Sequence, residues 1–132
     1  MPIVITTELS RIHVDAALAL LHTTYWAQTL DRDVLARAMA HSLCFGALEG
    51  DALVGFARVV TDRATYAYLT DFVVASSSRG RGIGHQMMGA MVAHPDLQKL
   101  RRFSLLTSDA MALYEEFGFA KGAGQLTYME RR

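Results

Sequence analysis

The segment 79–84, which reads Arg-Gly-Arg-Gly-Ile-Gly, has the composition best suited to chemistry in this chain. It follows an alternating, strand-like run from Tyr66 to Val74 and opens a helical pattern that extends from Ile83 to about His94. Glycines permit backbone conformations closed to residues with a Cβ, so successive N–H groups can converge on one anion. The positive end of the helix and the two arginines strengthen that attraction. We therefore expect the segment to bind the diphosphate of a cofactor.

Two common nucleotide-binding loops do not fit this segment. The dinucleotide fingerprint needs a third glycine three residues after the second, but His85 and Met87 follow Gly82 and Gly84 at that distance. The Walker loop ends in Gly-Lys-Ser or Gly-Lys-Thr, whereas this segment ends in Gly-His. A tight turn that caps a core helix is the plain alternative to a phosphate site.

The segment resembles the Arg/Gln-x-x-Gly-x-Gly/Ala signature of the GCN5-related N-acetyltransferase (GNAT) family, with Arg79 first, Gly82 fourth and Gly84 sixth. In that family the loop holds the pyrophosphate of acetyl-CoA. A second stretch, Ala112 to Phe119, looks like the family's Ala-x-x-Leu-Tyr-x-x-x-Gly-Phe signature in the last helix. Because two motifs at the right separation are more specific than one, the chain is identified as a member of this family.

Length and composition agree with one globular domain spanning residues 1–132. The chain is 52% hydrophobic and 20% charged, with a formal net charge of +0. Such a neutral chain lacks the basic footprint that nucleic-acid binding requires. The single cysteine, Cys44, favours a reducing compartment, and no signal peptide or membrane-length apolar run is present. We expect a cytoplasmic protein with no nucleic-acid or membrane partner.

The periodicity predicts an alternation of strands and helices along nearly the whole chain. The expected order is a strand at 3–6, a helix from Ser10, a helix from about Asp31 to His41, strands at 43–48, 53–60 and 66–74, a helix at 83–94, a strand at 103–106, a helix capped by Ser108 or Asp109 that ends near Phe117, and a strand from Leu126 to Glu130. This is the order of the family. The resemblance implies an α+β fold, an α/β/α sandwich whose mixed, mostly antiparallel sheet splays into a V between its two central parallel strands.

The resemblance also implies where the cofactor lies. The amides of residues 81–85 are assigned to the pyrophosphate, with the side chains of Arg79 and Arg81 adding charge, although a solvated rim explains Arg81 equally well. A bulge near Val74 would free its N–H for the thioester carbonyl. The full set of expected cofactor-binding residues is Phe72, Val73, Val74, Arg79, Gly80, Arg81, Gly82, Ile83, Gly84, His85, Ser108 and Tyr114. For Phe72 and Val74 the alternative is ordinary core packing, and for Ser108 it is capping of the last helix.

Tyr114 corresponds to the family tyrosine whose hydroxyl lies near the cofactor sulfur and acts as general acid. The proton acceptor is less well defined. Residues 68–74 resemble the Leu-Glu-Asp-x-x-Val strand of diamine and polyamine acetyltransferases, but Thr70 replaces the glutamate that supplies their base. Asp71 retains a carboxylate. It is assigned here as the second catalytic residue, with water as the alternative base and a purely structural role also open.

Acceptor recognition is assigned to the early helices and the neighbouring strands. The candidates are Tyr25, Trp26, Phe45, Arg58 and Tyr128, with core packing the default role for each aromatic. The five histidines do not show metal-ligand spacing, so we expect no metal. The resulting hypothesis is an acetyl-CoA-dependent N-acetyltransferase that acts on the primary amine of a small molecule by direct attack in a ternary complex. By analogy with the family we expect a homodimer. A non-catalytic acyl-CoA-binding or sensing module is the alternative.

Overall fold

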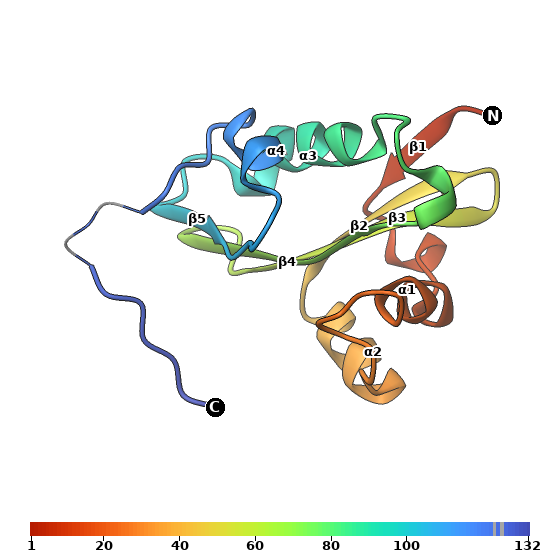
Figure 1. Cartoon of the computed structure of the whole chain (residues 1–132), viewed down its shortest axis with the longest axis horizontal. Helices are drawn as coiled ribbons and strands as arrows, with labels where there is room; N and C mark the ends of the chain where they lie inside the picture. The colour runs from red at the N-terminus through yellow and green to blue at the C-terminus, as the bar shows by residue number, and fades with distance from the viewer. Residues whose placement is uncertain (123, 125) are drawn as a thin grey trace.

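The computed structural model describes residues 1–122, 124 and 126–132 and arranges them in three layers (Figure 1). The strands are β1 (Ile3–Thr6), β2 (Leu43–Glu49), β3 (Ala52–Thr61), β4 (Tyr66–Val74) and β5 (Arg102–Leu105), and the α-helices are α1 (Val14–Leu21), α2 (Arg32–Ala40), α3 (Ile83–Ala93) and α4 (Met111–Glu115). Helices α1 and α2 cover one face of the sheet, while α3 and α4 cover the other (Figure 1). The expected α+β sandwich is confirmed. No helix among these residues is long and apolar enough to cross a membrane.

The sheet runs in chain order from β1 to β5, with every pair antiparallel except β4 and β5. This parallel pair extends only from Tyr66 opposite Arg102 to Leu69 opposite Leu105. Strand β4 continues to Val74, so its second half has no β5 neighbour and a slot opens between the strands. The predicted splay is therefore present, but at one end of the sheet rather than at its centre, because β5 is the edge strand.

An irregularity in β4 determines which side chains reach that slot. The register between β3 and β4 shifts between Phe56 and Arg58. Two β4 residues, Asp71 and Phe72, therefore lie opposite the one β3 residue that separates Phe56 from Arg58. Asp71 has φ 56°, a left-handed conformation that is uncommon for residues other than glycine. This is a β-bulge, which leaves one extra residue outside the ladder. We expected the bulge near Val74, and that prediction is wrong by two to three residues.

The bulge also inverts the alternation of side chains along β4. Before it, Leu69 belongs to the hydrophobic cluster under α3. After it, Phe72 and Val74 pack against that same cluster, whereas the intervening Val73 is buried in the cluster under α1 and α2. One inserted residue exchanges the two faces of a strand, because side chains alternate with a period of two.

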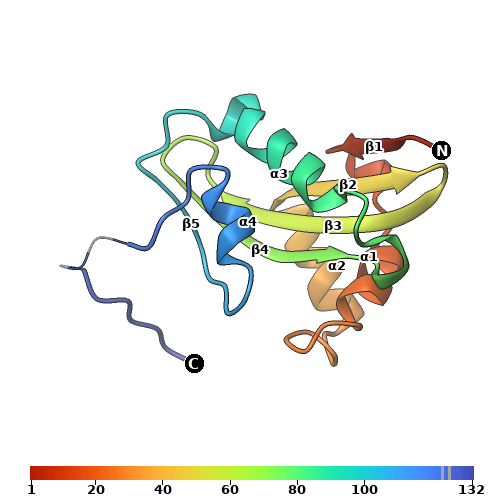
Figure 2. The same cartoon turned by 45° about the horizontal axis from the view of Figure 1, so that its top comes forward.

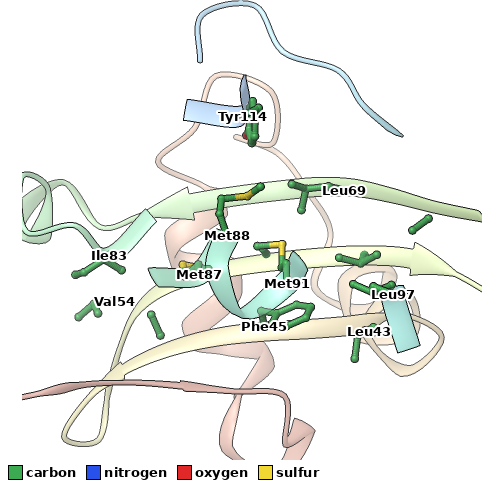
Figure 3. Packing of buried hydrophobic residues seen from close by; sticks show 14 residues of the cluster. Leu43, Phe45, Val54, Leu69, Ile83, Met87, Met88, Met91, Leu97 and Tyr114 are labelled. Atoms are coloured by element: carbon green, nitrogen blue, oxygen red, sulfur yellow. The ribbon is translucent and has the colours of Figure 1, made fainter. Parts of the chain in front are cut away.

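Helix α3 lies close against the sheet through a row of buried side chains (Figure 3). Ile83, Met87, Met88 and Met91 are each at most 2% exposed, so these side chains form part of the core. The close approach depends on Gly55 of β3, since a Cβ there would lie 2.8 Å from the Met87 sulfur. The helix thus holds the glycine-rich turn at its N-terminus in a fixed position over the end of β4.

The helix boundaries agree with the sequence patterns where the cap is a short side chain with local partners. Asp31, the predicted approximate start of this helix, is the N-cap of α2 and accepts hydrogen bonds from the N–H groups of Asp33 (3.1 Å) and Val34 (3.2 Å). Ser10 does not cap α1, because it lies in a 3₁₀ turn, Leu9–Arg11, and the helix begins after His13.

The start of α4 was also predicted wrongly. The helix begins after Ala110, whose N–H donates to the Thr107 hydroxyl at 3.0 Å. Neither Ser108 nor Asp109 caps it, and the Ser108 hydroxyl is engaged with another loop, as described below. The polar run 107–109 offers three similar capping side chains, and only the path of the backbone selects among them.

The C-terminal tail, defined here as residues 126–132, does not form the predicted strand. The described tail residues have no regular secondary structure, and the chain runs away from the sheet (Figures 1 and 2). Leu126, Tyr128 and Met129 are 73%, 65% and 86% exposed. A strand needs a neighbouring strand to satisfy its backbone groups, and none lies beside this tail within the described residues.

Candidate active site

The slot between β4 and β5 contains a cavity of about 600 Å³. It lies where β4 continues past the end of β5, with α4 on one side and the loop after α1 on the other. Its lining residues are Tyr25, Trp26, Tyr68, Leu69, Thr70, Asp71, Phe72, Leu105, Leu106, Thr107, Ser108, Asp109, Ala110, Leu113 and Tyr114. The cavity combines apolar side chains with the carboxylates of Asp71 and Asp109 and the hydroxyls of three tyrosines, and such a mixture can orient a ligand through a few polar groups.

Tyr114 is the most buried titratable side chain of this cavity, at 9% exposure. Its ring packs edge-on against Phe72, with centroids 6.2 Å apart, and Figure 3 shows it beside the core cluster. Burial, and secondarily the charge of Asp109, raises the pKa of the Tyr114 hydroxyl above its ordinary value. The hydroxyl is therefore protonated at neutral pH, as a general acid must be.

The glycine-rich turn surrounds a second hollow, of about 390 Å³, at the start of α3. Its lining residues are Val74, Ser78, Arg79, Gly80, Gly82, Ile83, Gly84 and His85. Gly80 and Gly82 have φ of 79° and 76°, values that favour glycine, and Gly82 is the N-cap of an 11-residue helix. Unpaired helical N–H groups and the helix dipole both favour an anion here. The turn therefore fits the diphosphate of CoA.

The two arginines of the turn have different surroundings. Arg79 lines the hollow. Arg81 instead forms a bidentate pair with Glu49 at the end of β2, through its NH1 on Oε1 (3.1 Å) and its NH2 on Oε2. The carboxylate holds that guanidinium away from the hollow, and the pair raises the pKa of Arg81 and lowers that of Glu49. Arg79 is thus the better placed of the two to meet a phosphate.

Asp71 lies between the slot and a third cavity. The Arg58 guanidinium donates to its Oδ2 at 3.0 Å, and Arg58 also donates to the Ser42 hydroxyl at 3.1 Å. The Arg58 and Asp71 side chains are 18% and 11% exposed, so the pair is largely shielded. The carboxylate keeps a second oxygen for another partner, since a carboxylate can accept several hydrogen bonds.

The third cavity, of about 330 Å³, lies under α2 and shares Asp71 and Trp26 with the slot. Its other lining residues are Ala27, Thr29, Leu30, Val34, Leu35, Ala38 and Arg58. The two cavities therefore approach Asp71 from different layers of the molecule. A molecule in the third cavity could present a polar group to Asp71 while a second molecule occupies the slot.

A hydrogen bond spans the mouth of the slot. The Tyr25 hydroxyl lies 2.9 Å from the Ser108 hydroxyl, joining the loop after α1 to the loop after β5. Tyr25 packs edge-on with Trp26 at 5.2 Å, and both rings are substantially exposed, at 71% and 50%. These residues, predicted from sequence as acceptor and cofactor contacts, lie together at the cavity entrance.

Some of the predicted residues lie elsewhere. Phe45 is 1% exposed, packs edge-on against His94 and belongs to the core. Val73 is 4% exposed and faces the cluster under α1 and α2. Tyr128 lies on the exposed tail and lines none of the cavities described above. Among the residues that the structure describes, His, Cys, Asp and Glu side chains do not gather in groups of three or more that could hold a metal.

The sequence did not indicate several residues that shape the site. Ser78 follows β4, is 5% exposed and lines the hollow at the glycine-rich turn. The run of three serines before Arg79 was an available signal for it. Glu49 controls Arg81 from 32 residues away, and Ser42 supports Arg58 from 16 residues away. Neither contact had a sequence signal, because both depend on how neighbouring strands are aligned.

Comparison with known proteins identifies the family. Residues 8–119 match the profile of the Acetyltransferase (GNAT) family. The chain belongs to this family. The matched residues include the glycine-rich turn, the bulged strand and Tyr114.

Individual relatives support the same assignment. A Gibberella zeae protein with a provisional acetyltransferase description is 32% identical, over 96% of this chain and 80% of that protein. A crystal structure from Xanthomonas campestris, described as belonging to the GNAT family, is 42% identical with a TM-score of 0.95 and covers 100% of this chain and 94% of that one. Glucosamine-6-phosphate N-acetyltransferase from Arabidopsis thaliana shares the fold at 13% identity, with a TM-score of 0.71 over 98% of this chain and 99% of that one.

Proposed function

We propose that this protein transfers an acetyl group from acetyl-CoA to the primary amine of a small molecule, by direct attack within a ternary complex. The observation that carries the proposal is a buried tyrosine in a slot that lies along the same strand, β4, as a hollow at the glycine-rich turn. Residues of β4 line both spaces, Phe72 the slot and Val74 the hollow. One extended cofactor could therefore occupy both, with its diphosphate at the turn.

When bound, acetyl-CoA supplies an activated acetyl thioester. The turn at 80–84 positions its diphosphate through backbone N–H groups, and Arg79 adds a positive charge. The bulge at Asp71 and Phe72 releases a backbone group from the ladder beside the slot, where it could stabilise charge that develops on a carbonyl oxygen. Tyr114 holds a proton at its hydroxyl oxygen, available to a departing thiolate.

Direct attack is favoured because the chain offers no suitable thiol nucleophile. Its one cysteine, Cys44, is 3% exposed, and burial raises the pKa of the thiol to about 11. A thiol with so high a pKa is almost entirely protonated at neutral pH, and the thiolate is the nucleophilic form. An acyl intermediate on this cysteine is therefore disfavoured, which supports direct attack of the acceptor amine on the thioester.

We assign Asp71 to the acceptor. Its carboxylate borders both cavities and lies where an amine entering from the α2 side would meet the slot. It would orient the ammonium group and accept its proton, directly or through water. Asp71→Asn keeps the shape but removes the negative charge, so kcat/KM for the amine should fall at least about tenfold. The KM for acetyl-CoA should change little. Unchanged amine kinetics would leave Asp71 with a purely structural role beside Arg58.

The central experiment is incubation of the protein with acetyl-CoA and a panel of amines, followed by measurement of free thiol. The panel should cover polyamines, amino acids, amino sugars and peptide N-termini. We expect thiol release above the hydrolysis rate for at least one class, with a matching acetylated product by mass spectrometry. Release at the hydrolysis rate across the panel would contradict the proposal.

One observation favours a second candidate, a non-catalytic acyl-CoA-binding module. Thr70 stands where diamine and polyamine acetyltransferases carry a glutamate, and Asp71, the nearest carboxylate, is already paired with Arg58. Such a module would bind CoA at the same turn but release no thiol with any amine. CoA binding without thiol release in the panel experiment would therefore support the non-catalytic module.

We further infer that the protein acts as a homodimer. The expectation comes from the family resemblance and is supported by the exposed apolar side chains of the tail, which a monomer leaves in water. Sedimentation of the full chain tests it, with a single species of one-chain mass as the contradicting result.

A further inference from the structure

The third cavity, under α2, combines one ion pair with a largely apolar wall. Arg58 and Asp71 are the charged residues among its described lining, so their formal charges balance. Leu30, Val34 and Leu35 contribute to the rest of the wall. The volume of about 330 Å³ lies near the lower end of the range for small-molecule sites, about 300–1,000 Å³. The cavity therefore suits a small ligand with an apolar part and no net charge.

The pair between Arg58 and Asp71 leaves a group of each side chain open. Arg58 donates from Nε to Asp71 Oδ2 at 3.0 Å and from Nη1 to the Ser42 hydroxyl at 3.1 Å, whereas the Arg81–Glu49 pair uses both carboxylate oxygens. Within the described part of the chain, Arg58 Nη2 and Asp71 Oδ1 make no hydrogen bond. No fully buried side-chain nitrogen or oxygen there lacks a partner, so both atoms reach accessible space.

The close spacing of the two charges restricts which ligand can meet both. The paired atoms are 3.0 Å apart, so the ligand's own positive and negative groups must also be adjacent. An α-amino acid carries its ammonium and carboxylate on one carbon, and a guanidinium binds a carboxylate well. A polyamine would bring extra positive charge toward Arg58, and a phosphorylated sugar would bring negative charge toward Asp71.

We propose that the acceptor is an α-amino acid with an apolar side chain, and that Arg58 selects it by binding its carboxylate. The inference rests on the acetyltransferase function proposed above and names its substrate class. The ammonium would lie at Asp71, beside the slot, and the side chain would enter the third cavity toward α2. Arg58 is then a specificity-determining residue, while Asp71 keeps the role already assigned to it.

The bulge in β4 supports this placement. A residue in a regular strand directs its side chain to one face of the sheet. Asp71, at the bulge with φ 56°, instead borders both the slot and the cavity under α2. Backbone in such a sparsely populated conformation is concentrated at functional sites. The bulge thus brings the ammonium site to the boundary between the two cavities.

The transfer balances with the groups already placed. The ammonium gives one proton to Asp71, directly or through water, and becomes a neutral amine. The amine nitrogen bonds to the acetyl carbonyl carbon as the C–S bond breaks, and the electron pair of that bond leaves on sulfur. Tyr114 donates a proton to the sulfur and regains one, through water, from the nitrogen. The products are an N-acetyl amino acid, the free thiol of CoA and one proton, which passes from Asp71 to solvent.

The first experiment is calorimetric titration of the protein, with CoA present so that no acetyl group can be transferred. The ligands are leucine, isopentylamine (leucine without its carboxylate), isocaproate (leucine without its amine) and ε-aminocaproate, an isomer of leucine with its charges at opposite ends. Leucine should bind at least about tenfold more tightly than each of the others, because each of them leaves Arg58 or Asp71 without a partner. Isopentylamine or ε-aminocaproate binding as tightly as leucine would overturn the proposal, and so would undetectable binding of leucine.

Arg58→Gln separates recognition of the carboxylate from general damage to the site. The dissociation constant of leucine should rise at least about tenfold, while that of isopentylamine should not rise, because a positive charge near its ammonium has been removed. Arg32→Gln is the matched control. Arg32 pairs with Asp15 at 2.6 Å and lines a separate hollow between α2 and the start of α1, so its loss should leave the ligand preference unchanged. Loss of affinity for leucine and isopentylamine by the same factor in Arg58→Gln would overturn the proposal.

Ala38→Leu tests the apolar part without altering the ion pair, and it keeps the proposal testable if Arg58→Gln does not fold. Ala38 lines the third cavity from α2 and is partly buried. The larger side chain should weaken leucine binding about tenfold and change the binding of free alanine less than about twofold. Ala36→Leu, on the same helix but lining the separate hollow, should affect neither ligand. An equal effect of Ala38→Leu on both ligands would overturn the proposal.

Thiol release from acetyl-CoA distinguishes failure of this inference from failure of the acetyltransferase proposal. The value of kcat/KM should be highest for apolar α-amino acids, with the N-acetyl amino acid detected by mass spectrometry. Thiol release with simple amines or amino sugars but not with α-amino acids would overturn the substrate class and leave the acetyltransferase proposal standing. Selective leucine binding without thiol release for any amine would support the amino-acid site and contradict acetyl transfer.

Discussion

Tyr114 and Asp71 line the same cavity from adjacent layers of the molecule. Tyr114 comes from α4, and its partner ring Phe72 belongs to the cluster under α3. Asp71 is held by Arg58 and borders the cavity under α2. The cavity thus brings together a tyrosine hydroxyl, which we assign to the leaving group, and a carboxylate, which we assign to the incoming amine.

Tyr114→Phe should lower kcat by about 10²–10⁴, the usual contribution of a positioned general acid. The ring and its contact with Phe72 remain, so the dissociation constant for CoA should stay within about twofold. The measurement is steady-state thiol release together with calorimetric titration of CoA.

Tyr66→Phe is the matched control for that substitution, because Tyr66 also carries a bonded hydroxyl but lies at the other end of β4, against Ser104. It should leave kcat nearly unchanged. A kcat for Tyr114→Phe within about twofold of the parent would remove the tyrosine from the mechanism.

Arg79→Ala should weaken CoA binding about tenfold, since a hydrogen bond to a charged group contributes about 1.5–3 kcal/mol. Arg81→Ala should change the affinity much less, because Glu49 already holds that guanidinium outside the anion hollow. Both substitutions remove one positive charge, so each controls for the other's long-range electrostatic effect. Equal losses of affinity at moderate salt would contradict the different placement of the two arginines.

At the scale of elements, the bulge in β4 and the turn before α3 together shape the slot and the hollow. The bulge exchanges the faces of β4, so Phe72 and Val74 join the α3 side, where Phe72 lines the slot and Val74 lines the hollow at the turn. The turn then uses Gly82 in a left-handed conformation to begin α3 with its N–H groups aimed at the hollow. Both are local departures from regular geometry, held in place by the buried face of α3.

Gly82→Ala tests the turn, and Gly89→Ala is its counterpart in the middle of the same helix. At Gly82 an alanine must adopt φ 76°, so we expect the free energy of unfolding to fall by about 1–2 kcal/mol, with weaker CoA binding. At Gly89 a Cβ meets no atom within 4 Å, so substitution by alanine should raise the free energy of unfolding by about 0.5–1 kcal/mol. Chemical denaturation of both variants measures the two changes in the free energy of unfolding. Changes of the same sign would contradict a strained backbone at Gly82.

At the scale of the whole molecule, the site is formed by the three layers together. The slot takes its walls from the loop after α1, from β4, and from the loop that joins β5 to α4. The Tyr25–Ser108 hydrogen bond links the loop after α1 to the loop between β5 and α4 at the entrance of the slot. A ligand in the slot would therefore contact both helical layers at once, so its binding should stabilise the domain as a unit.

CoA at about one hundred times its dissociation constant should add about 2.7 kcal/mol to the free energy of unfolding, which corresponds to a rise in Tm of roughly 10 °C for a domain of this size. Pantetheine, which lacks the diphosphate, should raise Tm much less at the same concentration, because it leaves the turn unfilled. The measurement is thermal unfolding followed by circular dichroism. An unchanged Tm with CoA would contradict both the enzymatic and the non-catalytic proposals.

The sequence by itself determined the features that depend on local composition. The spacing of Arg79, Gly82 and Gly84 marked the anion turn, because only glycine readily supplies left-handed backbone next to a helix start. The motif around Tyr114 marked the last helix, and alternating runs marked strands β2, β3 and β4. These signals are properties of neighbouring residues, so they can be read before the chain is folded.

Tertiary structure decided whatever depends on residues distant along the chain. It moved the bulge from Val74 to Asp71 and Phe72, paired Arg81 with Glu49, and buried Phe45 in the core. It also left residues 126–130 without the predicted strand, although their pattern suits one. A strand's hydrogen bonds lie outside its own segment, so only the arrangement of the other strands determines whether those bonds can form.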